Sequence, residues 1–266
     1  MNNHEIDYKI FGHDMQYVQV ELDPQETVVA EAGALMMMDE AIHMETIFGD
    51  GSQGGAQSGF MGKLLGAGKR LITGESLFMT TFTNVGSGKR HVYFASPYPG
   101  KIIPMDLSQL NGKIICQKDA FLAAAKGVSV GVEFQKKIGV GFFGGEGFIM
   151  QKLEGDGMAF VHAGGTIHEK ILQPGEVLRV DTGCLVAMTS SVDYNIEMVS
   201  GVKTALFGGE GIFFATLRGP GKVWIQSLPF SRLASRVFAA APVSKGGGGQ
   251  SAGEGGIGGL FDLFNK

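Results

Sequence analysis

The chain is poor in the residues from which many functional sites are built. Its 266 residues include two cysteines, one tryptophan and only 18% charged side chains, against roughly 25% in an average soluble domain. Two cysteines do not make a disulfide framework, so we expect Cys116 and Cys184 to be buried thiols in a reducing compartment. The formal net charge of −4 disfavours nucleic-acid binding, because nucleic-acid-binding domains usually carry a basic surface.

Long apolar runs are absent as well. No segment reaches the roughly 18 apolar residues that a membrane-spanning helix needs, and the polar start of the chain lacks the regions of a signal peptide. We therefore expect a cytoplasmic protein. The 44% hydrophobic content is still enough to fill a core. Together with the low charge, it suggests that part of the surface is buried between subunits.

No catalytic motif stands out. A phosphate-binding loop requires Gly-x-x-x-x-Gly-Lys-Ser/Thr, whereas the Gly-Glu-Gly stretches at Glu146 and Glu210 carry a carboxylate that would repel phosphate. His162 and His168 do not have the spacing of a metal site, and Cys-x-x-Cys and His-Glu-x-x-His are missing. Ser76 occupies a position where the other copies of its phrase carry glycine. We expect no enzyme, no catalytic residue, no cofactor and no metal.

What the chain does contain is repetition. Glu146 and Glu210 lie 64 residues apart (210 − 146), each within a Gly-Glu-Gly phrase. In both copies a matching phrase begins 29 residues earlier (146 − 117 and 210 − 181), and a second glycine turn follows 9 residues later (155 − 146 and 219 − 210). A fixed period indicates a repeated structural unit. The earlier phrases are residues 117–123 and 181–187, and residues 31–37 form a looser third copy.

Short runs of β-branched and aromatic residues lie between these turns, bounded by Gly, Pro, Asp or Asn, which is typical of strands. The 43 glycines suit frequent hairpin turns and bulges. Near the N-terminus, Val18, Val20 and Leu22 share one face of an expected strand. The other expected strands include residues 128–134, 158–162, 177–180 and 222–226.

One aromatic residue follows each second turn at a matching place. Phe160 and Trp224 match without a gap, and Tyr93 matches after a two-residue insertion. We expect these three side chains to occupy equivalent core or interface positions, where a large aromatic ring contributes strongly to packing.

These patterns predict an all-β fold of three tandem β-sandwich-like repeats, followed by a short amphipathic helix and a flexible Gly-rich tail. The first repeat holds an insertion of about 15 residues relative to the others (44 against 29), and insertions in one repeat often carry function. The predicted limits are 1–105 for the first repeat with its inserted loop 49–71, 106–170 for the second, 171–228 for the third, 229–241 for the helix, and 242–266 for the tail with its apolar end at 260–264.

Four strings taken together resemble a bacterial family of unknown function, whose eukaryotic relative is the mitochondrial protein named for altered inheritance of mitochondria. The strings are residues 32–35, 71–78, 142–148 and 180–187, and the resemblance covers about residues 5–240. It implies a fold similar to the tryptophan RNA-binding attenuation protein, with three such β units in one chain and three chains closing a ring-like trimer. It implies no catalytic residues.

The resemblance does not imply RNA binding by this chain. The matched turns hold Ser87, Asp156 and Pro220 in place of a repeated Lys/Arg set. Three functions stay open: a non-enzymatic homotrimeric scaffold or binding protein, which we favour; an RNA- or small-ligand-binding regulator; and a membrane-surface or partner-organising protein that uses the 49–71 loop or the C-terminal tail.

Overall fold

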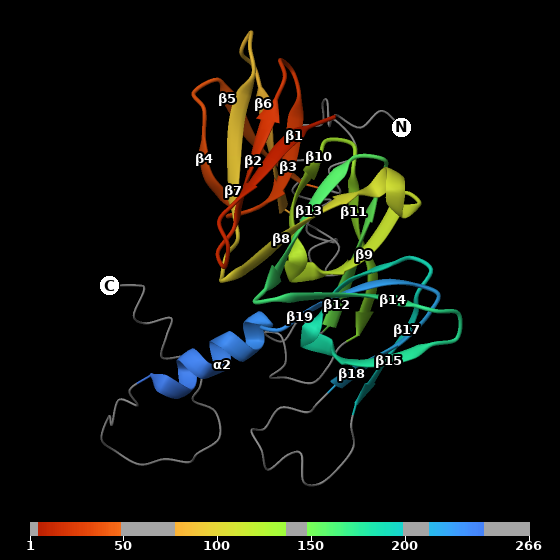
Figure 1. Cartoon of the computed structure of the whole chain (residues 1–266). Helices are drawn as coiled ribbons and strands as arrows, with labels where there is room; N and C mark the ends of the chain where they lie inside the picture. The colour runs from red at the N-terminus through yellow and green to blue at the C-terminus, as the bar shows by residue number, and fades with distance from the viewer. Residues whose placement is uncertain (1–4, 49–77, 137–147, 199–212, 242–266) are drawn as a thin grey trace. The chain divides into compact units, whose positions relative to one another are not determined.

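The computed structural model describes residues 5–48, 78–136, 148–198 and 213–241 (Figure 1). The chain divides into two compact units, Met1–Leu233, which holds every described strand, and Ala234–Lys266. The predicted all-β class is confirmed. The inserted loop, the Gly-Glu-Gly phrases and the Gly-rich tail lie outside the described residues.

The described strands form four antiparallel sheets. The first runs β1-β2-β7-β4, with β1 Asp7–Phe11, β2 Tyr17–Leu22, β7 Arg90–Ala95 and β4 Leu35–Met38. The second runs β5-β6-β3-β10-β13-β8, with β5 Ile42–Phe48, β6 Phe78–Asn84, β3 Thr27–Glu31, β10 Phe121–Ala125, β13 Met158–Gly164 and β8 Gly100–Asp106.

The third sheet runs β11-β12-β9-β16-β19-β14, with β11 Ser129–Lys136, β12 Phe148–Glu154, β9 Lys113–Gln117, β16 Leu185–Thr189, β19 Gly221–Gln226 and β14 Ile167–Leu172. The fourth runs β15-β18-β17, with β15 Val177–Asp181, β18 Phe213–Arg218 and β17 Asp193–Met198. Short 3₁₀ turns occur at η1 Leu107–Leu110, η2 Lys118–Ala120 and η4 Thr182–Cys184.

The same pairing scheme occurs three times. The strands β4, β10 and β16 pair with β7, β13 and β19, and each pair contains a register shift at the same place. The prediction that the three aromatic residues are equivalent is confirmed: Phe160 and Trp224 are buried and Tyr93 is half-buried. Just after the shift, Met37 lies opposite Tyr93, Ala123 opposite Phe160, and Ala187 opposite Trp224.

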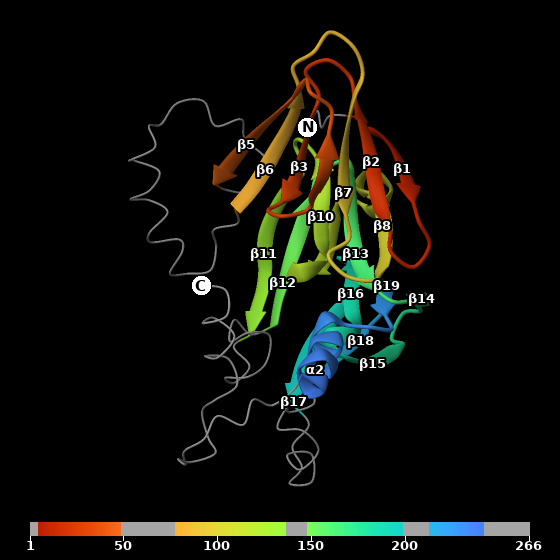
Figure 2. The same ribbon diagram turned by 90° about the vertical axis from the view of Figure 1, so that its left-hand side faces the viewer.

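The sheets join strands of neighbouring repeats. Strand β10 pairs with β3, and β16 pairs with β9; we call these two pairings the seams. Each six-stranded sheet therefore consists of two sets of three strands joined at a seam, and Figure 2 shows this for the sheet from β5 to β8. Because each seam covers both partners, β10 and β16 are almost completely buried.

The core is shared in the same way. One buried cluster contains Val29 of β3, Val161 of β13 and Trp224 of β19, which come from three different stretches of the chain. On β2 the predicted alternation is observed, since Val18, Val20 and Leu22 are fully buried and the residues between them are not. Alternate side chains of a strand point to opposite faces, so one face of β2 packs on the core.

Buried polar side chains tie the second and third repeats together. The Gln226 side-chain oxygen accepts a hydrogen bond from the Gly164 backbone N–H (2.7 Å), and its amide donates to the Gly183 carbonyl (2.8 Å). His162 lies 64 residues before Gln226 (226 − 162), is buried, and packs edge-on against Tyr98 with ring centroids 4.3 Å apart. His162 thus takes the equivalent place one repeat earlier.

Helix α2 spans Phe230–Ala240. Its apolar side chains recur at spacings of three and four residues, which gives an amphipathic helix. Near its start, Phe230 packs on Tyr98 with ring centroids 5.2 Å apart, and the Arg232 guanidinium lies 3.7 Å from an Asp181 carboxylate oxygen. The first turn of the helix is therefore attached to the β structure.

Candidate functional site

The histidines in the described part of the chain have different surroundings. His162 lies buried on β13, where burial lowers its pKa to about 4, while His168 lies exposed on the next strand, β14. His91 is placed between two carboxylates, with Nε2 3.2 Å from Glu21 and Nδ1 3.3 Å from Asp39. Across the four described ranges, no group of three or more His, Cys, Asp or Glu side chains could hold a metal ion.

The two cysteines differ in burial. Both are free; Cys116 is buried and Cys184 is partly buried. Burial raises the pKa of the Cys116 thiol to about 12, so it stays protonated at neutral pH and is a poor nucleophile.

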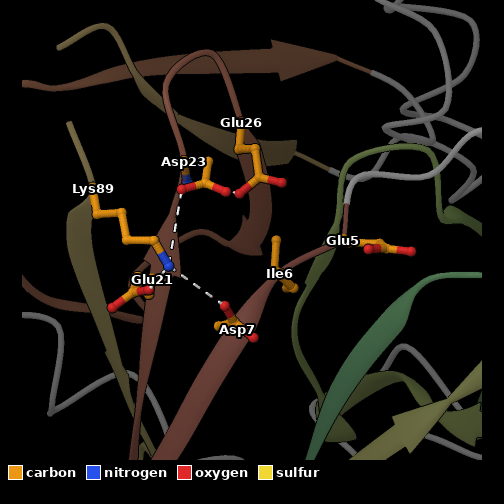
Figure 3. Close-up of a pocket in the computed structure, with 7 residues that line it drawn as sticks. All are labelled: Glu5, Ile6, Asp7, Glu21, Asp23, Glu26 and Lys89. Carbon is orange, nitrogen blue, oxygen red and sulfur yellow. Dashed lines mark hydrogen bonds and ion pairs between the residues drawn. The ribbon is translucent and has the colours of Figure 1, made fainter. Parts of the chain in front are cut away.

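A polar pocket of about 350 Å³ opens beside the first sheet (Figure 3). The Lys89 ammonium group points toward three carboxylates: it hydrogen bonds to Glu21 and lies 3.8 Å from Asp7 and 4.0 Å from Asp23. Glu26 accepts a hydrogen bond from the Asp23 backbone N–H (2.7 Å). The lining residues are Glu5, Ile6, Asp7, Glu21, Asp23, Glu26 and Lys89.

The charge of this pocket limits what it can bind. Five carboxylates share one ammonium group, so the pocket would repel phosphate and other anions. The Lys89 hydrogen bond lowers the pKa of Glu21, which keeps that carboxylate ionised. The pocket therefore offers no support for binding a nucleotide or an RNA backbone.

The most unusual surface is strand β4. Its methionines Met36, Met37 and Met38 are 39% to 48% exposed. In β10 and β16 the equivalent residues are at most 2% exposed, because β3 and β9 cover them. Among the described strands, β4 pairs only with β7, so its outer edge is open.

Strand β15, in the fourth sheet, has a second open edge. Its equivalents β3 and β9 are paired on both sides, whereas β15 pairs only with β18 among the described strands. Val177 is 47% exposed and Arg179 is also exposed, while Val180 is buried. The candidate functional site consists of these two open edges, β4 and β15.

Sequence reasoning did not single out either edge. A signal was present, because the run Leu35-Met36-Met37-Met38 is uniformly large and apolar where the other copies include alanine at Ala123, Ala124 and Ala187. Exposed methionine is common at adaptable binding surfaces. A comparison of side-chain size between copies would have pointed to β4.

None of the helices in the described part of the chain is both long enough and apolar enough to cross a bilayer.

Comparisons with known proteins place the chain. The model of the family described as mitochondrial biogenesis AIM24 matches residues 8–228. An uncharacterized protein of Streptococcus pyogenes serotype M6 is 32% identical over 235 residues, which are 86% of this chain and 89% of that protein. A crystal structure of a Streptococcus pyogenes protein has a TM-score of 0.69 at 24% identity, covering 89% of this chain and 100% of the other. The resemblance seen in the four strings is thereby confirmed, and the chain belongs to the mitochondrial biogenesis AIM24 family.

Proposed function

We propose that the protein is a non-enzymatic, cytoplasmic β scaffold that works as a homo-oligomer, with a homotrimer as its closed form. The observation that carries this proposal is the exposure of β4, a strand whose two equivalents are buried in sheets. An open apolar strand edge invites pairing with another chain. A partner strand on β4 would remove this liability.

Burial of β4 would favour association. Fully burying a methionine side chain stabilises by about 1.5–3 kcal/mol, and the three methionines of β4 are a little under half exposed. Covering them would contribute roughly 1 kcal/mol each, in addition to the backbone hydrogen bonds of a new strand pair. The low charge of the chain, 18%, agrees with a surface that is partly covered by subunits.

The expected result in solution is an oligomer at micromolar concentration. Three chains of 28.2 kDa would give about 85 kDa (3 × 28.2), since the paired edges bury apolar surface that a monomer leaves in water. Native mass spectrometry and light scattering measure this directly. A monomer of 28.2 kDa at that concentration would contradict the proposal.

Helix α2 favours a second candidate function, a membrane-surface or partner-organising protein. Phe230, Val237 and Phe238 are 53% to 61% exposed, and the helix contains two arginines, Arg232 and Arg236, and no acidic residue. A basic amphipathic helix of this kind can lie in the headgroup region of an anionic bilayer.

A flotation experiment tests this second candidate. The protein should float with vesicles that contain an anionic lipid, and replacing Val237 and Phe238 with serine should reduce the floated fraction severalfold because the apolar face is lost. Purely zwitterionic vesicles and an exposed-residue control, Val85→Ser on the β structure, separate helix insertion from general stickiness. Equal flotation of all three proteins would count against a role for α2.

A further inference from the structure

We infer that β4 of one copy pairs with β15 of a second copy, antiparallel, with Met37 opposite Val180. This inference rests on the proposed homo-oligomer and names the two surfaces that join it. It treats the contact between chains as a third seam, equivalent to the two seams inside the chain.

The register follows from the two internal seams. In the first, Ala123 of β10 lies opposite Ala30 of β3. In the second, Ala187 of β16 lies opposite Cys116 of β9. On β4, the residue equivalent to these two alanines is Met37, which lies opposite Tyr93 in its own sheet. On β15, the residue equivalent to their partners is Val180, which lies opposite Ala215.

The equivalence does not depend on sequence matching alone. Within their own sheets, Ala30 lies opposite Thr80 and Cys116 lies opposite Gln151, and these two pairings are equivalent. Val180 lies opposite Ala215, which follows Gln151 by 64 residues (215 − 151), so it continues the same series. The register shift before Met37 also matches the shifts before Ala123 and Ala187. The backbone of each open edge is therefore shaped like that of a seam strand.

The side chains differ between the seams in ways that suit an interface between chains. Met37 replaces an alanine, and methionine can adapt its shape to a partner surface. One residue further along, Met38 would face Arg179, where the internal seams have pairs of apolar residues. A charged residue on an open strand edge limits unspecific pairing, and the aliphatic part of Arg179 can still pack while its guanidinium stays in water.

The two edges are different surfaces, so the contact between copies is heterologous. Such contacts generate rings when the rotation closes. In the described structure β4 belongs to the first sheet and β15 to the last, and neither is paired with the other. The open edge β4 of one copy would therefore pair with the open edge β15 of the next copy.

Cysteine cross-linking between two differently tagged copies tests the inference. One copy carries Met37→Cys and the other Val180→Cys, and the pair is co-expressed and oxidised. Directly opposed strand residues come within reach of a disulfide, so a cross-linked species containing both tags should form on a non-reducing gel. Each variant alone, which still contains Cys184, supplies the background.

A matched control comes from Met44→Cys on β5 combined with Val180→Cys. Met44 is 49% exposed and Met37 is 45% exposed, so the two side chains are similarly accessible and differ mainly in position. We expect about ten-fold more mixed cross-link for Met37→Cys than for Met44→Cys, because only paired strands hold the thiols at high effective concentration.

The outcomes separate this inference from the proposed function. An oligomer that gives equal cross-linking for both combinations leaves the homo-oligomer standing and overturns the β4–β15 pairing. An oligomer whose mass is unchanged by Met37→Lys together with Met38→Lys does the same. A wild-type monomer overturns both. A mixed cross-link specific to position 37, with dissociation of the double lysine variant, supports the pairing.

Discussion

Replacing Phe160 with alanine should lower the free energy of unfolding by about 3–5 kcal/mol, the usual cost of removing a buried phenylalanine. Phe160 is fully buried in β13, which has a hydrogen-bonded strand on each side. Its ring also makes an edge-to-face contact with Tyr8, with centroids 5.0 Å apart. The strands hydrogen bonded on both sides of β13 limit how far the backbone can close over the cavity, so the loss should fall in the upper part of that range.

Denaturant unfolding at a fixed protein concentration measures this loss, and the single tryptophan, Trp224, provides the fluorescence signal. The matched control is Tyr93→Ala, the equivalent position in the first sheet. Tyr93 is only half-buried, so its removal should cost about 1–2 kcal/mol. Equal losses for the two variants would show that burial does not distinguish these equivalent positions.

The fold class could be predicted because two independent periods agree in the sequence. Alternation of apolar residues, as at Val18 and Val20, identifies strands with one buried face. The 64-residue spacing of Phe160 and Trp224 identifies equivalent places in a repeated structure. Both signals can be recognised from the order of the residues alone, without knowing which strands pair.

The seams could not be predicted in the same way. Alternation specifies which face of a strand is buried and leaves open which strand lies on each edge. In the sequence, Ala123 is an apolar strand residue whether its strand pairs with β3 of the previous repeat or with another strand of its own repeat. The exchange of strands between repeats therefore appears only in the structure, and with it the open edges that form the candidate site.

The raised pKa of Glu31, at the end of the first seam, could not be predicted from the sequence either. Glu31 appeared in the sequence only as the first residue of a repeated phrase. In the structure it ends β3 and is partly buried near Asp119. Burial first, and then the negative charge of Asp119, raise the pKa of Glu31 from 4.5 to about 7. A sequence does not show that a carboxyl group at a strand end is desolvated.

Replacing Glu31 with glutamine should therefore stabilise the protein at neutral and alkaline pH. The folded-state pKa of Glu31 lies above its unfolded value, so its ionisation costs stability as the pH rises from 4.5 through 7. Relative to wild type, Glu31→Gln should gain nothing below about pH 4.5 and up to about 3 kcal/mol above pH 7. Partial exposure of the carboxyl group lowers the expected plateau to about 2 kcal/mol.

The chain supplies its own precedent for this substitution. Gln117 occupies the equivalent position in the second repeat, where it is buried, and Gly183 stands there in place of Asp119. A neutral amide is thus compatible with the end of a seam strand. Denaturant unfolding of wild type and Glu31→Gln at a series of pH values measures the difference, and a gain that is independent of pH would mean that charge is not its cause.

His162 should give the opposite slope, and it makes the test of Glu31 more exacting. Burial lowers the pKa of His162 from 6.5 to about 4, so protonation costs stability as the pH falls from 6.5 to 4. Between pH 4.5 and 6.5 the two contributions oppose each other, and the stability of the wild type should change little. In Glu31→Gln, only His162 titrates, so the free energy of unfolding should rise with pH in this window. In His162→Gln, which introduces the residue found at Gln226, only Glu31 titrates, so the free energy of unfolding should fall with pH. In the double variant it should again be nearly independent of pH. Parallel profiles for the two single variants would show that these side chains do not control the pH dependence.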